Sequence, residues 1–117
     1  MTILVVDNDE RMRRTITNIL ASQMITCIEC DDGSKALDLY RKIQPAWVLM
    51  DVLMPGTNGF EATQNILTSY PDARIAIVTD YNDIEFRDAA RRSGASAYIL
   101  KEELISLREK ITLTTNP

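Results

Sequence analysis

The sequence predicts an α/β domain in which a five-stranded parallel sheet is covered by helices on both faces. Two observations lead to this fold class. Short apolar segments alternate five times with segments of helical periodicity, and four of these apolar segments are continuous. Continuous apolar runs are typical of strands buried on both faces, and strand-helix alternation with short turns produces a parallel sheet with right-handed crossovers. The length of 117 residues and the lack of an internal linker indicate one domain, residues 1–117.

The expected elements alternate along the chain, beginning with a strand. The strands are residues 3–6, 25–30, 46–50, 75–78 and 97–100. A helix follows each strand, because apolar side chains recur there at three- and four-residue spacing. The five stripes, in chain order, are Met12, Ile16, Ile19 and Leu20; Ala36, Leu37, Tyr40 and Ile43; Phe60, Ile66, Leu67 and Tyr70; Phe86, Ala89 and Ala90; and Leu104, Leu107 and Ile111.

Polar residues and one glycine mark the ends of these helices. Asn58 and Asp83 precede the third and fourth helices and suit N-caps, because their side chains can accept hydrogen bonds from the first free backbone N–H groups. Gly94 follows the fourth helix and suits a C-terminal stop.

The segment at residues 25–30 is the most polar of the five strands, so we expect it at an edge of the sheet. An edge position fits the strand order 2-1-3-4-5 of a flavodoxin-like (βα)5 three-layer sandwich. Cys27 and Cys30 lie on this segment, and residues three apart on a strand point to opposite faces. We therefore interpret them as two reduced, packed thiols and not as a metal or redox pair.

Composition excludes several classes of function. There are 13 basic and 17 acidic residues, so the net charge of −4 offers no positive field for nucleic acid or anionic lipid. The chain has no histidine, which excludes Ser/His/Asp and Cys/His catalysis and a histidine-ligated zinc. No apolar run approaches the ~18 residues of a membrane span, and the N-terminus does not read as a signal peptide. We expect a cytoplasmic protein.

Four strands each end in one polar residue, and the predicted topology brings these residues to one edge of the sheet. They are Asp7, Asp51, Thr79 and Lys101. Clustered carboxylates repel each other unless a cation is present, and Mg²⁺ prefers carboxylate, water and phosphate oxygens. The ammonium and hydroxyl groups suit the remaining oxygens of a transferring phosphoryl group. We expect a phosphoryl-transfer site with a carboxylate nucleophile that forms an acyl phosphate.

The segments around these strand ends resemble the receiver domain of two-component response regulators. They are VVDNDE at residues 5–10, MDVLMPGTNG at 50–59, VT at 78–79 and YILK at 98–101. The resemblance covers nearly the whole chain. It implies that Asp51 accepts a phosphoryl group from a phosphohistidine of a sensor histidine kinase. It also implies a signalling domain that catalyses only its own phosphorylation and dephosphorylation.

The resemblance implies roles for the residues around the phosphoacceptor. Asp7 would hold Mg²⁺ together with the phosphoacceptor carboxylate, and Leu53 would offer its backbone carbonyl to the ion. Thr79 and Lys101 would contact the phosphoryl group. Tyr98 would turn inward after phosphorylation, as the surface of the fourth helix, fifth strand and fifth helix changes shape. That surface is also where a homodimer would form.

Three positions depart from the family's pattern. Asn8 stands where a second carboxylate is usual, so we expect weakened Mg²⁺ binding; Asp9 is better explained as a helix cap than as a substitute ligand. Asp80 stands where a small residue is usual and would slow phosphorylation and hydrolysis. Glu102 follows Lys101 in place of proline, which resembles the NarL/FixJ subfamily. That resemblance implies either a receiver from a longer regulator whose helix-turn-helix DNA-binding domain is absent from this chain, or a stand-alone receiver of the same lineage.

Two other functions remain open at this point. The first is a pseudo-receiver that is not phosphorylated and works as an interaction module, which Asn8 and Asp80 favour. The second is a haloacid-dehalogenase-type phosphatase, because the sequence Asp7-Asn8-Asp9 also fits the Asp-x-Asp motif of those enzymes. Stoichiometric labelling of Asp51 would favour the receiver, whereas turnover of a small phosphoester would favour the phosphatase.

Overall fold

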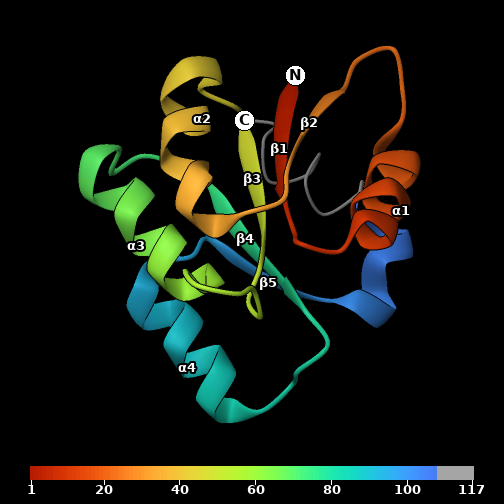
Figure 1. Ribbon diagram of the computed structural model, residues 1–117. Coiled ribbons are helices and arrows are strands. Elements are labelled where there is room, and N and C mark those ends of the chain that lie inside the picture. The colour runs from red at the N-terminus through yellow and green to blue at the C-terminus, as the bar shows by residue number, and fades with distance from the viewer. Residues whose placement is uncertain (108–117) are drawn as a thin grey trace.

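The computed structural model describes residues 1–107 and confirms the expected α/β architecture (Figure 1). All five strands are parallel, in the order β2-β1-β3-β4-β5. The strands are β1 (Thr2–Val6), β2 (Thr26–Cys30), β3 (Trp47–Asp51), β4 (Ile75–Thr79) and β5 (Ala97–Leu100). The α-helices are α1 (Glu10–Leu20), α2 (Ala36–Ile43), α3 (Gly59–Ser69) and α4 (Ile84–Ser93), and the 3-10 helices are η1 (Gly33–Lys35) and η2 (Lys101–Ser106).

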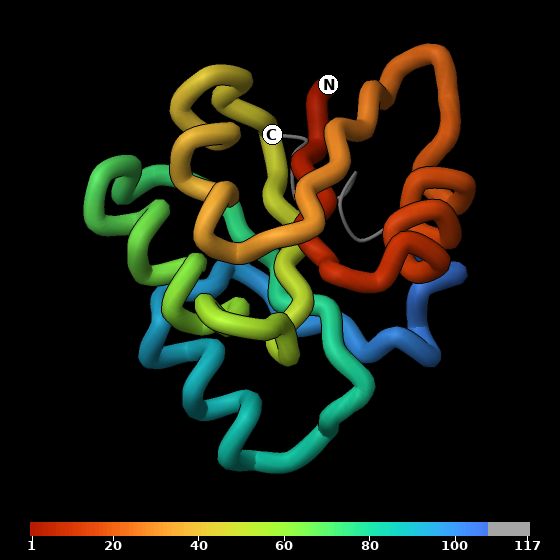
Figure 2. Tube along the Cα trace, viewed as in Figure 1, coloured from red at the N-terminus to blue at the C-terminus, as the bar shows by residue number. Residues whose placement is uncertain are grey.

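The helices form a layer on each side of the sheet. α2, α3 and α4 cover one face, and α1 and η2 lie together on the other, although they come from opposite ends of the chain (Figures 1 and 2). The most polar strand, β2, lies at one edge, as its polar composition predicts. The three-layer arrangement is therefore confirmed for the described part of the chain.

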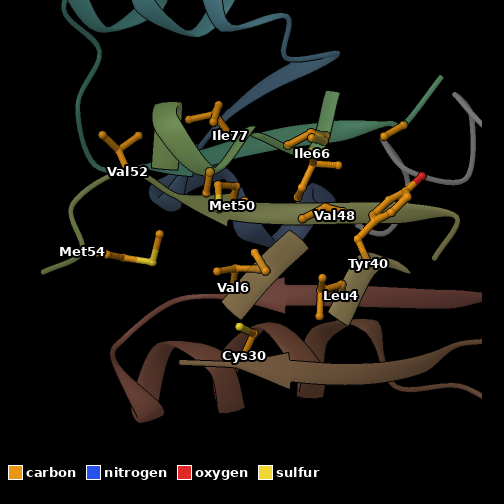
Figure 3. Packing of buried hydrophobic residues seen from close by; sticks show 14 of the residues in the cluster. Leu4, Val6, Cys30, Tyr40, Val48, Met50, Val52, Met54, Ile66 and Ile77 are labelled. Carbon is orange, nitrogen blue, oxygen red and sulfur yellow. The ribbon is translucent and has the colours of Figure 1, made fainter. Parts of the chain in front are cut away.

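Alternate residues of each central strand enter two separate hydrophobic clusters. Leu4 and Val6 of β1 face α2, α3 and α4 (Figure 3), whereas Ile3 and Val5 face α1 and η2. All four side chains are buried, which explains why the run is continuous and not alternating. Trp47 begins β3 in the second cluster, and its indole N–H has no hydrogen-bond partner among the described residues.

The two cysteines lie as expected. Cys30 packs into the cluster under α2, α3 and α4 (Figure 3), Cys27 packs against the opposite cluster, and both are free thiols.

The helix ends follow the sequence signals with one exception. The Asn58 side chain accepts a hydrogen bond from the Glu61 N–H at 3.0 Å, and Gly94 ends α4 with a left-handed φ of 94°. The Asp9 carboxylate accepts from the Arg11 N–H at 3.0 Å, so the interpretation of Asp9 as the cap of α1 is confirmed. Asp83 stands at the N-cap position of α4, but its side chain makes no capping hydrogen bond.

The segment after β5 begins as a 3-10 helix and not as the expected α-helix. Leu104 and Leu107 of the predicted stripe are buried, whereas Ile111 lies outside the described residues. Between residues 1 and 107, no helix is both long and apolar enough to cross a membrane.

Candidate functional site

The carboxyl ends of the central strands surround one small cavity. Because parallel strands all end at the same edge of the sheet, their terminal side chains meet there. The cavity has a volume of about 200 Å³. It is lined by Asp7, Asn8, Asp9, Asp51, Leu53, Thr79, Asp80, Tyr81 and Lys101. The structure thus places the four strand-end residues that the sequence singled out around one pocket, and Asn8 and Leu53 also line it.

Lys101 lies between the two buried carboxylates. Its Nζ atom is 3.3 Å from Oδ1 of Asp51 and 3.8 Å from Oδ2 of Asp7. The exposed fractions of the three side chains are 16% for Lys101, 9% for Asp51 and 3% for Asp7. One ammonium group is therefore shared by two carboxylates in a poorly hydrated site, and the trio carries one negative charge in excess when all three groups are ionised.

Burial and this excess charge shift the pKa values of all three groups. Burial raises the pKa of Asp51 most, the charge of Asp7 raises it further, and Lys101 only partly offsets them, so that the pKa reaches about 6. Burial also raises the pKa of Asp7, although the Asp9 N–H and Lys101 oppose the increase. Burial alone lowers the pKa of Lys101, but the charges of Asp51 and Asp7 outweigh it, and its pKa lies above the usual value. With all three groups ionised, the negative charge of the two carboxylates exceeds the positive charge of the one ammonium group.

The oxygen atoms around this pocket suit a hard divalent cation. Asp7 and Asp51 offer carboxylates, and Asn8 and Leu53, also on the pocket wall, offer an amide and a backbone carbonyl. Within residues 1–107 there is no cluster of three or more histidine, cysteine or acidic side chains that could hold a metal alone. The donor set fits Mg²⁺, which commonly takes one or two protein carboxylates and keeps several waters.

The backbone of Tyr81 connects Thr79 to Tyr98. The Tyr81 N–H donates to Oγ1 of Thr79 at 3.3 Å, and the Tyr98 hydroxyl donates to the Tyr81 carbonyl. Thr79 is buried, but its hydroxyl hydrogen remains available to a ligand because it uses only a lone pair in this contact. Tyr98 is half-buried, and the Arg87 guanidinium lies 4.6 Å from its ring centroid.

Sequence analysis did not single out two residues that contact this site. Tyr81 acts through its backbone, so no side-chain pattern could have indicated it. Arg13 donates from Nη1 to the Asp7 carbonyl at 2.8 Å. Its position on the polar side of a predicted helix gave no sign that its side chain reaches back to the preceding strand.

The chain matches the family described as the response regulator receiver domain over residues 3–112. The transcriptional regulatory protein DegU of Brevibacillus brevis is 33% identical over 102 residues, covering 86% of this chain and 43% of that protein. The response regulator GacA of Pseudomonas aeruginosa is 38% identical over 103 residues, covering 85% and 47%. The chain thus spans less than half the length of these relatives.

Solved structures of similar proteins have the same fold. A two-component response regulator of the LuxR family from Aurantimonas sp. SI85-9A1 superposes with a TM-score of 0.90 at 30% identity, covering 97% of this chain and 83% of that one. The response regulator domain of Thermotoga maritima CheB gives a TM-score of 0.88 at 26% identity, covering 100% and 98%.

Proposed function

This chain belongs to the response regulator receiver domain family, and on that premise we propose that Asp51 accepts a phosphoryl group from a phosphohistidine of a sensor histidine kinase in a Mg²⁺-dependent reaction. Receiver domains are signalling domains and not classical enzymes. The observation that carries the proposal is the placement of the Asp51 carboxylate in an open pocket, 3.3 Å from the Lys101 ammonium and beside Asp7.

The chain contributes to this reaction mainly by positioning the reacting groups and by stabilising the charge of the phosphoryl group. A carboxylate oxygen of Asp51 attacks phosphorus, the bond from phosphorus to the donor imidazole nitrogen breaks, and the imidazole leaves with the electron pair. With a pKa of about 6, Asp51 is mostly ionised at neutral pH, as a nucleophile must be. Lys101 stabilises the negative charge of the phosphoryl oxygens. When bound by Asp7, Asp51, the Leu53 carbonyl and Asn8, Mg²⁺ would supply the missing positive charge.

The phosphoryl group would then change the surface formed by α4, β5 and η2. It adds a charge of about −1.5 to −2 and three acceptor oxygens. The free hydroxyl hydrogen of Thr79 can donate to one of these oxygens while Oγ1 keeps its contact with the Tyr81 N–H. A shift of Thr79 toward the phosphoryl group therefore pulls on Tyr81 and, through the carbonyl of Tyr81, on Tyr98. This is the route by which we expect Tyr98 to turn further inward.

The output of this receiver is proposed to be control of a DNA-binding domain that follows it. DegU, which is named a transcriptional regulatory protein, supports this because the matched region covers only 43% of its length, and the similar structure from Aurantimonas is named a LuxR-family regulator. The pair Lys101-Glu102 supports the same subfamily. The homodimer through α4, β5 and η2 and the cytoplasmic location remain parts of this proposal.

Labelling with acetyl phosphate tests the proposed function. With Mg²⁺ present, we expect one phosphoryl group per chain, lost in Asp51→Asn and on removal of Mg²⁺ by a chelator. Intact mass spectrometry measures both. A folded protein that takes up no phosphoryl group from acetyl phosphate or from a kinase would instead be the pseudo-receiver that Asn8 and Asp80 favour. The phosphatase alternative is not retained, because the family match covers residues 3–112 and Asp9 caps α1.

A further inference from the structure

Asp7 is held by four separate contacts at the end of β1. Its N–H donates to the Cys30 carbonyl at 3.0 Å, and its Oδ1 accepts from the Asp9 N–H at 2.9 Å. Its Oδ2 lies 3.8 Å from Lys101 Nζ, and its carbonyl accepts from Arg13 Nη1 at 2.8 Å. The first two contacts use backbone donors or acceptors of the partner residue, so they survive most substitutions there. The contact with the Asp7 carbonyl depends on one side chain, Arg13.

Arg13 is itself fixed by a second partner. Its Nε donates to Oε1 of Glu29 on β2 at 2.9 Å, and its side chain is only 14% exposed. Because a guanidinium is planar, two hydrogen bonds to different acceptors set both its position and its plane. Arg13 thus joins α1, the end of β1 and the edge strand β2 at one point.

The adjacent arginine provides a contrast on the same helix. Arg14 pairs with Glu10 one turn away at 3.1 Å, and both side chains are largely exposed, at 67% and 72%. Exposed pairs of this kind contribute little to stability. The two arginines therefore share chemistry and helix position but differ in whether they reach a residue of the pocket.

We propose that Arg13 is a positioning residue for the phosphoryl-transfer site: it holds the Asp7 carbonyl so that the Asp7 carboxylate stands beside Asp51 and Lys101, ready to bind the divalent cation. This inference rests on the function proposed above for the same site. It gains weight from Asn8, which is neutral and exposed, so that Asp7 is the charged oxygen ligand that the β1-α1 turn contributes to the buried trio. Any loosening of Asp7 therefore acts directly on cation binding.

The test compares Arg13→Met with Arg14→Met in the unphosphorylated protein. Residues that orient metal ligands typically change metal affinity by about tenfold or more, so Arg13→Met should weaken Mg²⁺ binding about tenfold in calorimetry. It should also shift the amide resonance of Asp9, which reports the Asp7 carboxylate, in Mg²⁺-free protein. With acetyl phosphate, the Mg²⁺ concentration for half-maximal labelling should rise while the rate at saturating Mg²⁺ changes little. Arg14→Met should leave all three readouts unchanged.

Two further variants separate positioning from charge and from folding. Arg13→Lys keeps the positive charge but not the planar guanidinium that donates to both Asp7 and Glu29, so it should bind Mg²⁺ as weakly as Arg13→Met. Full Mg²⁺ affinity in Arg13→Lys would overturn the inference. Glu29→Ala leaves the Asp7 contact but removes the acceptor of the Arg13 Nε hydrogen bond, so the guanidinium plane is no longer fixed and Mg²⁺ affinity should fall. This variant decides the matter if Arg13→Met fails to fold, and unchanged affinity would then count against the inference.

The outcomes for this inference and for the proposed function can be told apart. If the unaltered protein binds Mg²⁺ and folded Arg13→Met binds it with equal affinity, only the role of Arg13 is overturned. An unaltered protein that binds no Mg²⁺ and takes no phosphoryl group would overturn both.

Discussion

The ionisation of Asp51 links the chemistry of the pocket to the stability of the domain, because only the ionised carboxylate is a strong nucleophile, whereas burial favours the neutral form. Its pKa of about 6 lies above the usual 3.8. Between these two values the folded state binds more protons than the unfolded state. Ionisation of Asp51 at neutral pH therefore lowers the stability of the folded domain, and the proposed Mg²⁺ ion would remove this conflict.

We predict that the stability of the Mg²⁺-free protein relative to Asp51→Asn falls as pH rises from about 4 to about 7. A carboxyl group with a raised pKa loses its favourable protonation as pH passes through about 6, whereas asparagine does not titrate. Over this range the free energy of unfolding of the unaltered protein should fall by about 1 to 3 kcal/mol relative to that of Asp51→Asn. Urea denaturation at several pH values measures it. A difference that stays constant with pH would contradict the raised pKa.

A second prediction concerns Asn8, which lines the pocket without a charge. Asn8→Asp should tighten Mg²⁺ binding by about tenfold, equivalent to about 1.4 kcal/mol, because it adds a carboxylate to a hard-cation site. Asp9→Asn is the matched control on the same turn, since asparagine also caps helices and Asp9 serves α1. Equal Mg²⁺ affinities in Asn8→Asp and the unaltered protein would show that Asn8 does not limit cation binding.

Elements differ in how firmly they hold the pocket. The strands β3 and β4 are buried along their whole length, whereas α4 buries only Ala90 and Ser93. Aromatic contacts hold the first turns of α4. The ring centroid of Phe86 lies 4.7 Å from that of Tyr81, on which it stacks, and 6.1 Å from that of Phe60. Of the four α-helices that the structure describes, α4 therefore buries the fewest apolar side chains, which agrees with its weak stripe in the sequence.

The start of α3 packs so closely on β3 that only glycine fits at residue 59. A Cβ atom there would collide with the Asp51 backbone carbonyl. Gly59→Ala should therefore cost several kcal/mol of stability and displace the phosphoacceptor, as measured by thermal unfolding and by acetyl phosphate labelling. Gly56→Ala in the loop before α3 is the comparison: a Cβ there would meet no atom within 4 Å, so the substitution costs only the strain of its positive φ of 74°, about 1 kcal/mol. Similar losses in both variants would contradict the close approach.

Removing one oxygen atom eliminates the side-chain hydrogen bond between Tyr98 of β5 and the loop after β4. Tyr98→Phe keeps the ring beside Arg87 but removes the hydroxyl that donates to the Tyr81 carbonyl. We expect unchanged labelling of Asp51 but smaller shifts of the α4 amide resonances when a phosphate mimic binds. Full-sized α4 shifts in Tyr98→Phe would show that the change travels by another route.

At the scale of the whole molecule, the topology and the principal pocket residues could be predicted from sequence because both follow from where apolar runs stop. Asp7 and Asp51 each end a buried run, and parallel strands must bring such ends together. Arg13 and Tyr81 could not be predicted, since one acts through a long side chain that reaches back to another element and the other through its peptide groups. The missing capping bond of Asp83 and the 3-10 geometry of η2 could not be predicted either, because residue type and apolar spacing do not fix a side-chain rotamer or distinguish a 3-10 from an α-helical turn.

Because the strands are parallel, the acidic pocket lies at their carboxyl ends, and the amino ends of the strands lie at the opposite edge of the sheet. Trp47 begins the strand that Asp51 ends, so four residue steps, about 13 Å of extended backbone, separate the residue with the single indole from the residue with the carboxylate. The fluorescence of this buried ring therefore reports loss of the native fold while being remote from events at the acidic pocket. Denaturation curves followed by tryptophan emission can thus be compared directly between phosphorylated, cation-loaded and substituted forms of this domain.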